Sequence, residues 1–205
     1  MILPYKYNTV KKFSEGIYTE KGSKFLAFGF HLQNDEKIKS IKEQLRKEHH
    51  KAVHVAYAYR LGYTGETEKV SDDGEPAGSA GKPILNVLKK HDLTYCAIFV
   101  VRYYGGKKLG IPGLIHAYAA AVNNVLEKST MEIIAIKEFY KIMCNTAQLN
   151  TIVHVINQYG AQIETMNIED ETSNFIISFE REYAETVLSK LKTLWNTQLE
   201  YIESV

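Results

Sequence analysis

The stretch LTYCAIFVVRYYGGKKLGIPGLIHAYAAAV, residues 93–122, decides the fold of the first half of the chain. Its first part, LTYCAIFVVRYYGG, is the most continuous apolar run in the protein, which is typical of a central strand. A glycine-rich loop follows, and the residues after it predict a long helix from about Pro112 to Lys128. The alanines of LIHAYAAAV share one face of that helix, so the helix can pack closely on a sheet.

The residues before this stretch complete a first unit. The expected strands occupy residues 8–20, 23–33 and 52–62, with the turn EKGS between the first two. A helix capped by Asn34 or Asp35 follows the second strand, and a short helix started by Pro83 precedes the central strand. The predicted order of elements is β-β-α-β-α-β-α.

The last third of the chain predicts a second unit. Strand-type alternation in 136–146, 161–168, 174–180 and 198–203 is interrupted by helical spacing in 147–160 and 184–195. The order β-α-β-β-α-β is the ferredoxin-like pattern, with both helices on one side of an antiparallel sheet. The sequence therefore predicts an α+β protein of two domains, residues 1–132 and 133–205.

Charge divides the chain near the same place. The whole sequence has 25 Lys and Arg against 24 Asp and Glu. Residues 1–134 hold 20 basic and 14 acidic side chains, a net charge of +6, whereas residues 135–205 hold 5 and 10, a net charge of −5. A basic front half attracts polyanions, although +6 over this length is a modest excess.

Composition excludes several classes of protein. The charged fraction of 24% and the hydrophobic fraction of 45% are those of an ordinary globular protein. No apolar run reaches the ~20 residues that a membrane-spanning helix needs, and the start lacks the apolar core of a signal peptide. A cytoplasmic protein without a membrane partner is expected, with Cys96 and Cys144 as buried, reduced thiols.

Two irregular segments, residues 63–82 and 103–113, each run from a strand into a helix. The first contains VSDDGEPAGSAGKP and the second contains YYGGKKLGIPG. Glycines, lysines and the start of a helix together suit an anion-binding site. The first segment does not fit the phosphate-binding loop, because Pro76 and Pro83 stand where that loop needs Gly and Ser or Thr. The dinucleotide fingerprint also fails, because the spacing is wrong for Gly105, Gly106, Gly110 and Gly113.

Metal binding is an alternative interpretation of the acidic residues in the first segment. Carboxylates of DDGE, residues 72–75, suit Mg²⁺, but Asp-Gly also favours a turn. HHKAVH, residues 49–54, has several possible zinc ligands but spans a helix end and a strand start. No nucleophile with an evident base can be identified, and we expect neither a metal nor a cofactor.

The motifs KGSKF, SDDGEPAGSAGKP and VVRYYGGKKLGIPGLIHAYAAA resemble those of the YigZ/IMPACT family. The resemblance extends over the whole chain. It implies an N-terminal domain like the second domain of a ribosomal small-subunit protein, and a ferredoxin-like C-terminal domain like the last domain of elongation factor G. Eukaryotic members regulate translation by countering the activation of a starvation-sensing kinase, and nucleic-acid or ribosome binding is suggested for bacterial members.

The resemblance also implies which residues matter. Matching positions lie in the first motif, in the strand that follows it, in the acidic loop and in the last motif: Lys21–Phe25, His54, Tyr57, Ser71–Pro76, Gly78, Gly81, Pro83, Arg102–Gly106, Leu109, Gly110, Gly113, Leu114, Ala117 and Tyr118. Ile111-Pro112 replaces the usual Thr-Gly, His116 replaces a cation, and a cysteine common near Ala56 is absent. Because Pro112 has no N–H, these changes weaken an anion site at the last helix.

Three functions remain open. The first is an accessory translation-related protein that binds RNA or the ribosome, the second a protein-binding regulator, and the third a metal-dependent enzyme acting on a phosphorylated substrate. The first two would use one candidate surface around the two irregular segments, and the third would hold a metal ion with Asp72, Asp73 and Glu75 of that surface. The predicted residues of this surface are Lys24, Asp72, Asp73, Glu75, Lys82, Arg102, Tyr103, Tyr104, Gly105, Gly106, Lys107, Lys108, Gly110, His116 and Tyr118.

Overall fold

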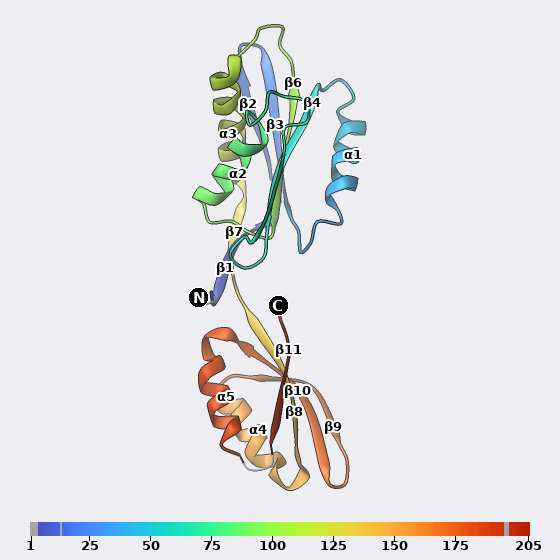
Figure 1. The fold of residues 1–205 in the computed structure, drawn as a ribbon, viewed down its shortest axis with the longest axis vertical. Helices are drawn as coiled ribbons and strands as arrows, with labels where there is room; N and C mark the ends of the chain where they lie inside the picture. Colours follow the sequence, from blue (N-terminus) through green and yellow to red (C-terminus); the bar gives the residue numbers. More distant parts are fainter. Residues whose placement is uncertain (1–3, 13, 195–196) are drawn as a thin grey trace. The chain divides into compact units, whose positions relative to one another are not determined.

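The computed structural model of the protein describes residues 4–12, 14–194 and 197–205. Contacts divide these residues into two compact units (Figure 1). The front unit is Tyr7–Ile134, and the rear unit is Ala135–Val205 together with the described residues before Tyr7. Each unit combines helices with an antiparallel sheet, which confirms the expected α+β class with two units.

The front unit is built on a five-stranded sheet of order β2-β3-β6-β4-β5, antiparallel at every pairing. The strands are β2 (Glu15–Glu20), β3 (Ser23–His31), β4 (His54–Leu61), β5 (Thr67–Ser71) and β6 (Cys96–Tyr103). The apolar run of the sequence forms β6, which lies in the middle of the sheet and is buried at every residue except the last. The prediction of a central strand is confirmed.

Helices cover both faces of this sheet (Figure 1). α2 (Gly81–Lys90) and α3 (Gly110–Lys128) pack on one face, and α1 (Ile38–Glu48) packs on the other. Alternate residues of a strand point to opposite faces, so Ile98 and Val100 of β6 join the α2 and α3 core, whereas Phe99 and Val101 join the α1 core. Burial on both faces explains why the run shows no polar alternation.

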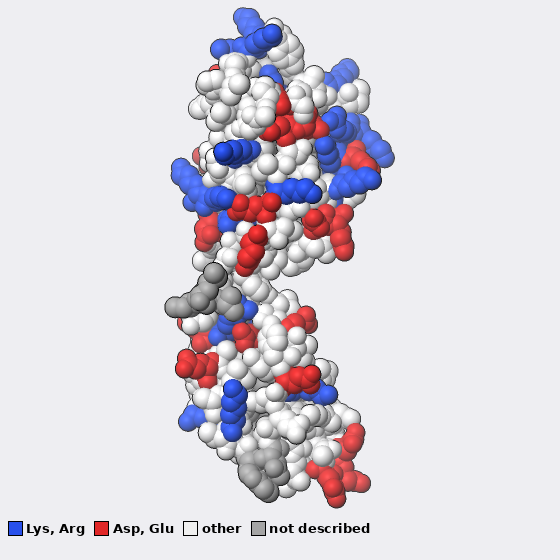
Figure 2. Space-filling view, viewed as in Figure 1, with Lys and Arg blue, Asp and Glu red and all other residues white. Residues whose placement is uncertain are grey.

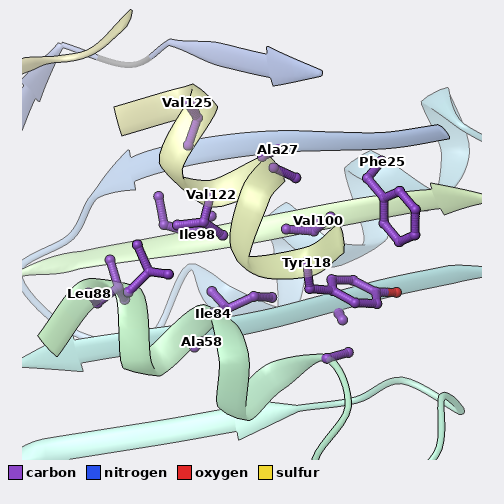
Figure 3. Packing of buried hydrophobic residues seen from close by; sticks show 14 of the residues in the cluster. Phe25, Ala27, Ala58, Ile84, Leu88, Ile98, Val100, Tyr118, Val122 and Val125 are labelled. Carbon is purple, nitrogen blue, oxygen red and sulfur yellow. The ribbon is translucent and has the colours of Figure 1, made fainter. Parts of the chain in front are cut away.

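Alanine and glycine allow α3 to lie close to the sheet. Figure 3 shows Tyr118, Val122 and Val125 of α3 packed over the strands together with Ile84 and Leu88 of α2. At Gly16 of β2 an added Cβ would lie 2.6 Å from the Val125 backbone nitrogen. A side chain at that position would push α3 away from the sheet.

The N-terminal strand departs from the prediction. Residues 8–20 do not form one strand: β1 (Lys6–Lys12) pairs with the unpredicted β7 (Thr130–Ala135) in a two-stranded sheet, whereas β2 joins the main sheet. Phe13, between β1 and β2, lies outside the described residues. Alternation predicts a strand but does not say which sheet the strand joins.

Segment 63–82 also departs from the prediction, because it contains β5 on the edge of the main sheet. The sequence TEKVS shows no apolar alternation, because four of its five residues are exposed and need not be apolar. The strand is held in place by its backbone pairing with β4. The cap predicted for α1 is wrong as well. Neither Asn34 nor Asp35 caps the helix, which begins after Lys37 without a side-chain cap, and the Asp35 carboxylate accepts a hydrogen bond from the Tyr59 hydroxyl at 2.9 Å.

The rear unit has the expected order. Its elements are β8 (Lys137–Asn145), the short 3₁₀ turn η1 (Thr146–Gln148), α4 (Leu149–Gln158), β9 (Gln162–Ile168), β10 (Thr172–Glu180), the 3₁₀ turn η2 (Arg181–Tyr183), α5 (Ala184–Lys192) and β11 (Gln198–Ser204). The sheet order β11-β8-β10-β9, with α4 and α5 on one face, is the ferredoxin-like arrangement (Figure 1). Trp195, placed in the second helix by the sequence, lies outside the described residues.

Both cysteines are free and buried, Cys96 in β6 and Cys144 in β8. Burial raises the pKa of the Cys96 thiol to about 12, so this group stays protonated and unreactive at neutral pH. Within the described part of the chain, no helix has the length and apolar character for crossing a membrane.

Candidate functional site

The acidic loop between β5 and α2 is held in one shape by its own carboxylates. Asp72 accepts hydrogen bonds from the backbone N–H groups of Gly78, Ala80 and Gly81, at 2.8, 3.0 and 2.8 Å. Burial alone would raise the pKa of Asp72, but these three donors outweigh it and leave the pKa below its usual range. Asp72 therefore closes the loop onto the start of α2.

Asp73 connects the loop to α1 and β4. Its carboxylate contacts Lys42 at 2.7 Å and Arg46 at 2.5 Å, and it accepts the backbone N–H of Val55. Burial acts to raise the pKa of Asp73, but Lys42, the Val55 N–H and Arg46 together lower it below the usual range. The residue has a φ of 51°, in the left-handed region that Asp tolerates better than most residues.

Glu75 is buried at the centre of a polar group between β4, β6 and α3. Its Oε1 accepts from Arg102 Nη1 at 2.6 Å and from the Tyr118 hydroxyl at 2.8 Å. His54 donates from Nδ1 to the Asp73 carbonyl oxygen at 2.8 Å, and its Nε2 lies 3.8 Å from Glu75 Oε2. Burial, followed by the neighbouring Glu75, raises the pKa of Tyr118, so this hydroxyl remains a donor.

The three acids of DDGE therefore do not converge. Asp72 binds backbone N–H groups, Asp73 binds two cations of α1, and Glu75 binds Arg102 and Tyr118. Among the residues that the structure describes, no three His, Cys, Asp or Glu side chains form a group suited to a metal ion. His49, from the other candidate cluster, contacts the Tyr103 hydroxyl at 2.9 Å instead.

The glycine loop after β6 packs against the turn between β2 and β3. The Gly105 N–H donates to Ser23 Oγ at 3.1 Å, and a Cβ at Gly105 would overlap with the backbone of Gly22. The motifs KGSKF and YYGG thus contact each other through Gly22, Ser23 and Gly105. Next to it, the Arg102 guanidinium lies 5.5 Å from the Phe25 ring centre and 5.7 Å from that of Tyr104.

The acidic loop and the glycine loop meet at a cavity of about 600 Å³ in the front unit. Two of its lining side chains, Glu75 and Arg102, are buried and charged, and the lining as a whole is mainly apolar. The lining residues are Val53, His54, Glu75, Pro76, Arg102, Tyr104, Lys108, Leu109, Gly110, Ile111 and Leu114. A concave, mainly apolar site with a few polar groups is the usual form of a binding pocket.

The structure places five of the predicted surface residues in the lining of this cavity: Glu75, Arg102, Tyr104, Lys108 and Gly110. Asp72, Asp73 and Tyr118 instead support the loops and Glu75, as described above. Lys24, Lys82, Gly106, Lys107 and His116 are exposed but do not line it, and the His116 ring contacts Tyr18. Tyr103 contacts His49 and Gly105 packs on Gly22.

The predicted surface did not include the apolar wall, although Pro76, Leu109 and Leu114 are among the positions that match the family motifs. Val53, Leu109, Ile111 and Leu114 come from the end of the α1–β4 connection and from the start of α3, and Pro76 comes from the acidic loop. The exposed fractions of Val53 and Ile111, 46% and 53%, are large for apolar side chains. An apolar residue in a loop was the available signal, but only folding shows which of them share a cavity.

Charge on the front unit is patchy. On the face shown in Figure 2, blue Lys and Arg side chains alternate with red Asp and Glu side chains and do not form one continuous basic surface. Part of the positive charge is neutralised, since Lys42 and Arg46 pair with Asp73, and Lys89 pairs with Glu68. These pairs leave the net charge of +6 unchanged, but they make Lys42, Arg46 and Lys89 less available to a partner.

Comparison with known proteins identifies close relatives. Residues 21–126 match the model of the Impact N-terminal domain. IMPACT family member YigZ of Escherichia coli is 36% identical over 145 residues, 70% of this chain and 71% of that protein. IMPACT family member YvyE of Bacillus subtilis is 36% identical over 135 residues, which span 63% of this chain and 62% of the relative.

Solved structures share the fold of the whole chain. The crystal structure of a hypothetical protein is 29% identical, covers 98% of this chain and 99% of its own, and has a TM-score of 0.71. A Thermus thermophilus protein covers all of this chain with 30% of its own length, at 12% identity and a TM-score of 0.55, which shows likeness of fold alone.

Proposed function

Because this chain belongs to the IMPACT family, we propose that it is an accessory translation-related protein of the cytoplasm that binds single-stranded RNA, free or in the ribosome. The binding surface of this proposal is the pair of loops around the cavity of the front unit. The observation that carries it is the joint presence in this cavity of Arg102, Lys108 and the half-exposed ring of Tyr104.

Each of these groups suits one part of an RNA strand. Lys107 and Lys108 are exposed in the glycine loop, where they can neutralise phosphates of the RNA backbone. Tyr104 is 48% exposed, so an unpaired base can stack on the part of its ring that Arg102 does not cover. Duplex DNA presents no free base face, and single strands are therefore the favoured partner.

Protein binding is the second candidate, and the apolar wall of the cavity favours it. Val53 and Ile111 could bury an apolar side chain of a protein partner as well as a base. Metal-dependent catalysis receives no such support, because the carboxylates of Asp72, Asp73 and Glu75 have separate partners in the described structure. RNA remains the proposal because the wall adjoins two cations.

The proposal is tested by titrating labelled single-stranded RNA with the protein at two salt concentrations. Each phosphate contact on a single strand contributes about 0.7 to the slope of log affinity against log salt. Replacing Lys107 and Lys108 by Ala should therefore lower the affinity and flatten the slope by roughly 1.4. Tyr104→Ala should weaken binding by about 1–3 kcal/mol with little change of slope, because stacking releases no counterions.

Matched controls separate these effects from loss of charge or of aromatic surface elsewhere. Lys47→Ala with Lys128→Ala removes the same charge from exposed positions of α1 and α3 away from the cavity. Tyr183→Ala removes a rear-unit ring that is also 48% exposed. If the folded protein binds no RNA at low salt, or if the controls weaken binding as much as the loop variants, RNA binding by this surface is refuted and protein binding becomes the better explanation.

A further inference from the structure

Arg102 has more hydrogen-bonding capacity than its surroundings use. The side chain is only 7% exposed, yet Nη1 is the one guanidinium nitrogen with a hydrogen-bond partner among the described residues. Its Nε is buried with no partner in that part of the chain. Buried arginines normally have most of their donors satisfied, so a donor-rich guanidinium beside a cavity indicates an acceptor that is supplied from outside.

We propose that the cavity binds a single nucleotide through a terminal phosphate, with its base against Tyr104 and the apolar wall. This inference rests on the proposed RNA function and narrows it. The partner class is a phosphomonoester nucleotide, either a free mononucleotide or the phosphorylated end of an RNA strand.

The anionic end of the ligand follows from the charges that line the cavity. Arg102 and Lys108 are cations, and the 19-residue helix α3 starts at Gly110 without a side-chain cap. Its first turn adds partial positive charge at the same place through the backbone N–H groups that remain beside Pro112, which has none. The one carboxylate of the lining, Glu75, is already neutralised by Arg102 and hydrogen-bonded by Tyr118. Because Glu75 offsets the charge of Arg102, the uncompensated positive charge of the lining is that of Lys108, and a phosphate that also accepts from the free donors of Arg102 would balance it.

The apolar part of the lining indicates that the other end of the ligand is flat and apolar. Leu109, Ile111 and Leu114 present alkyl groups from the start of α3, and Tyr104 presents its ring from the glycine loop. A planar base fits between an aromatic ring and alkyl groups, where it removes apolar surface from water. Inorganic phosphate alone would leave this wall exposed.

The size and depth of the cavity favour a terminal phosphate. About 600 Å³ is within the range of pockets that hold one small molecule. Arg102 is 7% exposed and lines the cavity, so a phosphate that enters the cavity can contact its guanidinium. A terminal phosphate enters with one nucleoside attached, whereas an internal phosphodiester would have to bring in two.

The experiment measures the affinity of the full chain for the four nucleoside monophosphates, the four nucleosides and inorganic phosphate by calorimetry. We expect at least one monophosphate to bind about tenfold or more tightly than both its nucleoside and phosphate, because it alone fills both ends of the cavity. Ile111→Glu should reduce that affinity about tenfold, since it places a negative charge at the mouth of the cavity. Glu in the first turn of a helix is compatible with folding.

Two further variants make the result specific. Lys108→Ala should weaken monophosphate binding and leave nucleoside binding unchanged, whereas Lys128→Ala, at the far end of α3, should change neither. Arg102→Gln is made together with Glu75→Gln, so that no unpaired charge stays buried. If this double variant keeps its thermal unfolding transition, it should lose most of the preference for the monophosphate over the nucleoside, and an unchanged preference would overturn the role of Arg102.

An RNA arm separates this inference from the proposed function. RNA oligonucleotides of one sequence are compared with a 5′-phosphate, a 3′-phosphate or no terminal phosphate. Tighter binding with a terminal phosphate supports the inference. Equal binding of all three RNAs, with no binding of monophosphates at about 1 mM, overturns it and leaves RNA binding intact. Monophosphate binding without RNA binding supports the inference and refutes the proposed RNA function.

Discussion

At the scale of single residues, Glu75 is the most consequential side chain of the front unit. It is the partner of a buried arginine and of a buried tyrosine, and both would lose an acceptor if it were removed. We predict that Glu75→Ala lowers the free energy of unfolding by about 3–5 kcal/mol, because it leaves Arg102 as an unpaired buried charge. Tyr118→Phe removes one hydrogen bond only and should cost about 1 kcal/mol.

Denaturant unfolding of the full chain measures both effects. Glu127→Ala, at an exposed position near the end of α3, provides the control for loss of a glutamate. A loss from Glu75→Ala that is no larger than the loss from Glu127→Ala would show that the pair with Arg102 contributes nothing to stability.

Asp73 makes stability depend on acid pH. Its pKa in the folded protein lies below 3.8, the value of the unpaired group, so its contribution is fully present above 3.8 and is lost as the pH falls through the folded value. We predict that Asp73→Asn lowers stability at neutral pH by about 1.5–3 kcal/mol, the range of hydrogen bonds to charged groups. The difference from the natural protein should shrink as the pH falls below 3.8.

Asp92→Asn is the matched control for this pH dependence. Asp92 has a φ of 48°, close to the 51° of Asp73, but it is exposed. Its substitution should change stability little at either pH. A constant difference between the natural protein and Asp73→Asn at all pH values would contradict the assignment of the ion pairs.

At the scale of elements, the site depends on a backbone contact between the β2–β3 turn and the loop after β6. Gly105→Ala places a Cβ against the Gly22 backbone, and neither main chain can rotate away as a flexible side chain would. We predict a loss of about 1–3 kcal/mol, the typical cost of overpacking, together with weaker RNA binding as the loop moves.

Gly106→Asn tests whether this effect is specific. Gly106 has a φ of 82°, and its Cβ would have open space around it. Because Asn tolerates positive φ better than other residues with a side chain, the cost should be smaller than that of Gly105→Ala. Equal losses of stability from the two variants would show that the loop conformation, and not the contact with Gly22, limits stability.

At the scale of the whole molecule, the two units carry separate cores. The front unit buries its sheet under α1, α2 and α3, and the rear unit has a core of its own under α4 and α5. We predict that residues 1–135, which keep β7 whole, unfold cooperatively when expressed alone. Circular dichroism during thermal denaturation measures this, and a fragment without a cooperative transition would refute the independence of the front unit.

The opposite net charges of the two units predict that RNA binds mainly to the front unit. Residues 135–205 carry a net charge of −5, which repels phosphate. The fragment of residues 1–135 should therefore retain most of the RNA affinity of the full chain, as measured by the same titration. Loss of binding by a folded fragment would place part of the binding surface in the rear unit.

The sequence by itself determined the central strand, the long helix and the ferredoxin-like order, because each has a strong local pattern. β6 needs an unbroken apolar run since it is buried on both faces, and α4 and α5 need apolar residues at helical spacing. β5 was missed because four of its five residues are exposed and it depends on hydrogen bonds from β4. β7 contains apolar residues, but none is buried, and its partner strand β1 is distant in the sequence.

The tertiary structure decided what the motif residues do. The sequence pointed to Glu75, Arg102 and Tyr104 as candidates, but it treated DDGE as one group and every nearby lysine as equivalent. Folding gives each carboxylate different partners and leaves Lys108, but not Lys107, in the lining of the cavity. The physical reason is that hydrogen bonds and cavities join residues from β4, β6 and α3 that are distant along the chain, and no local pattern encodes those distances.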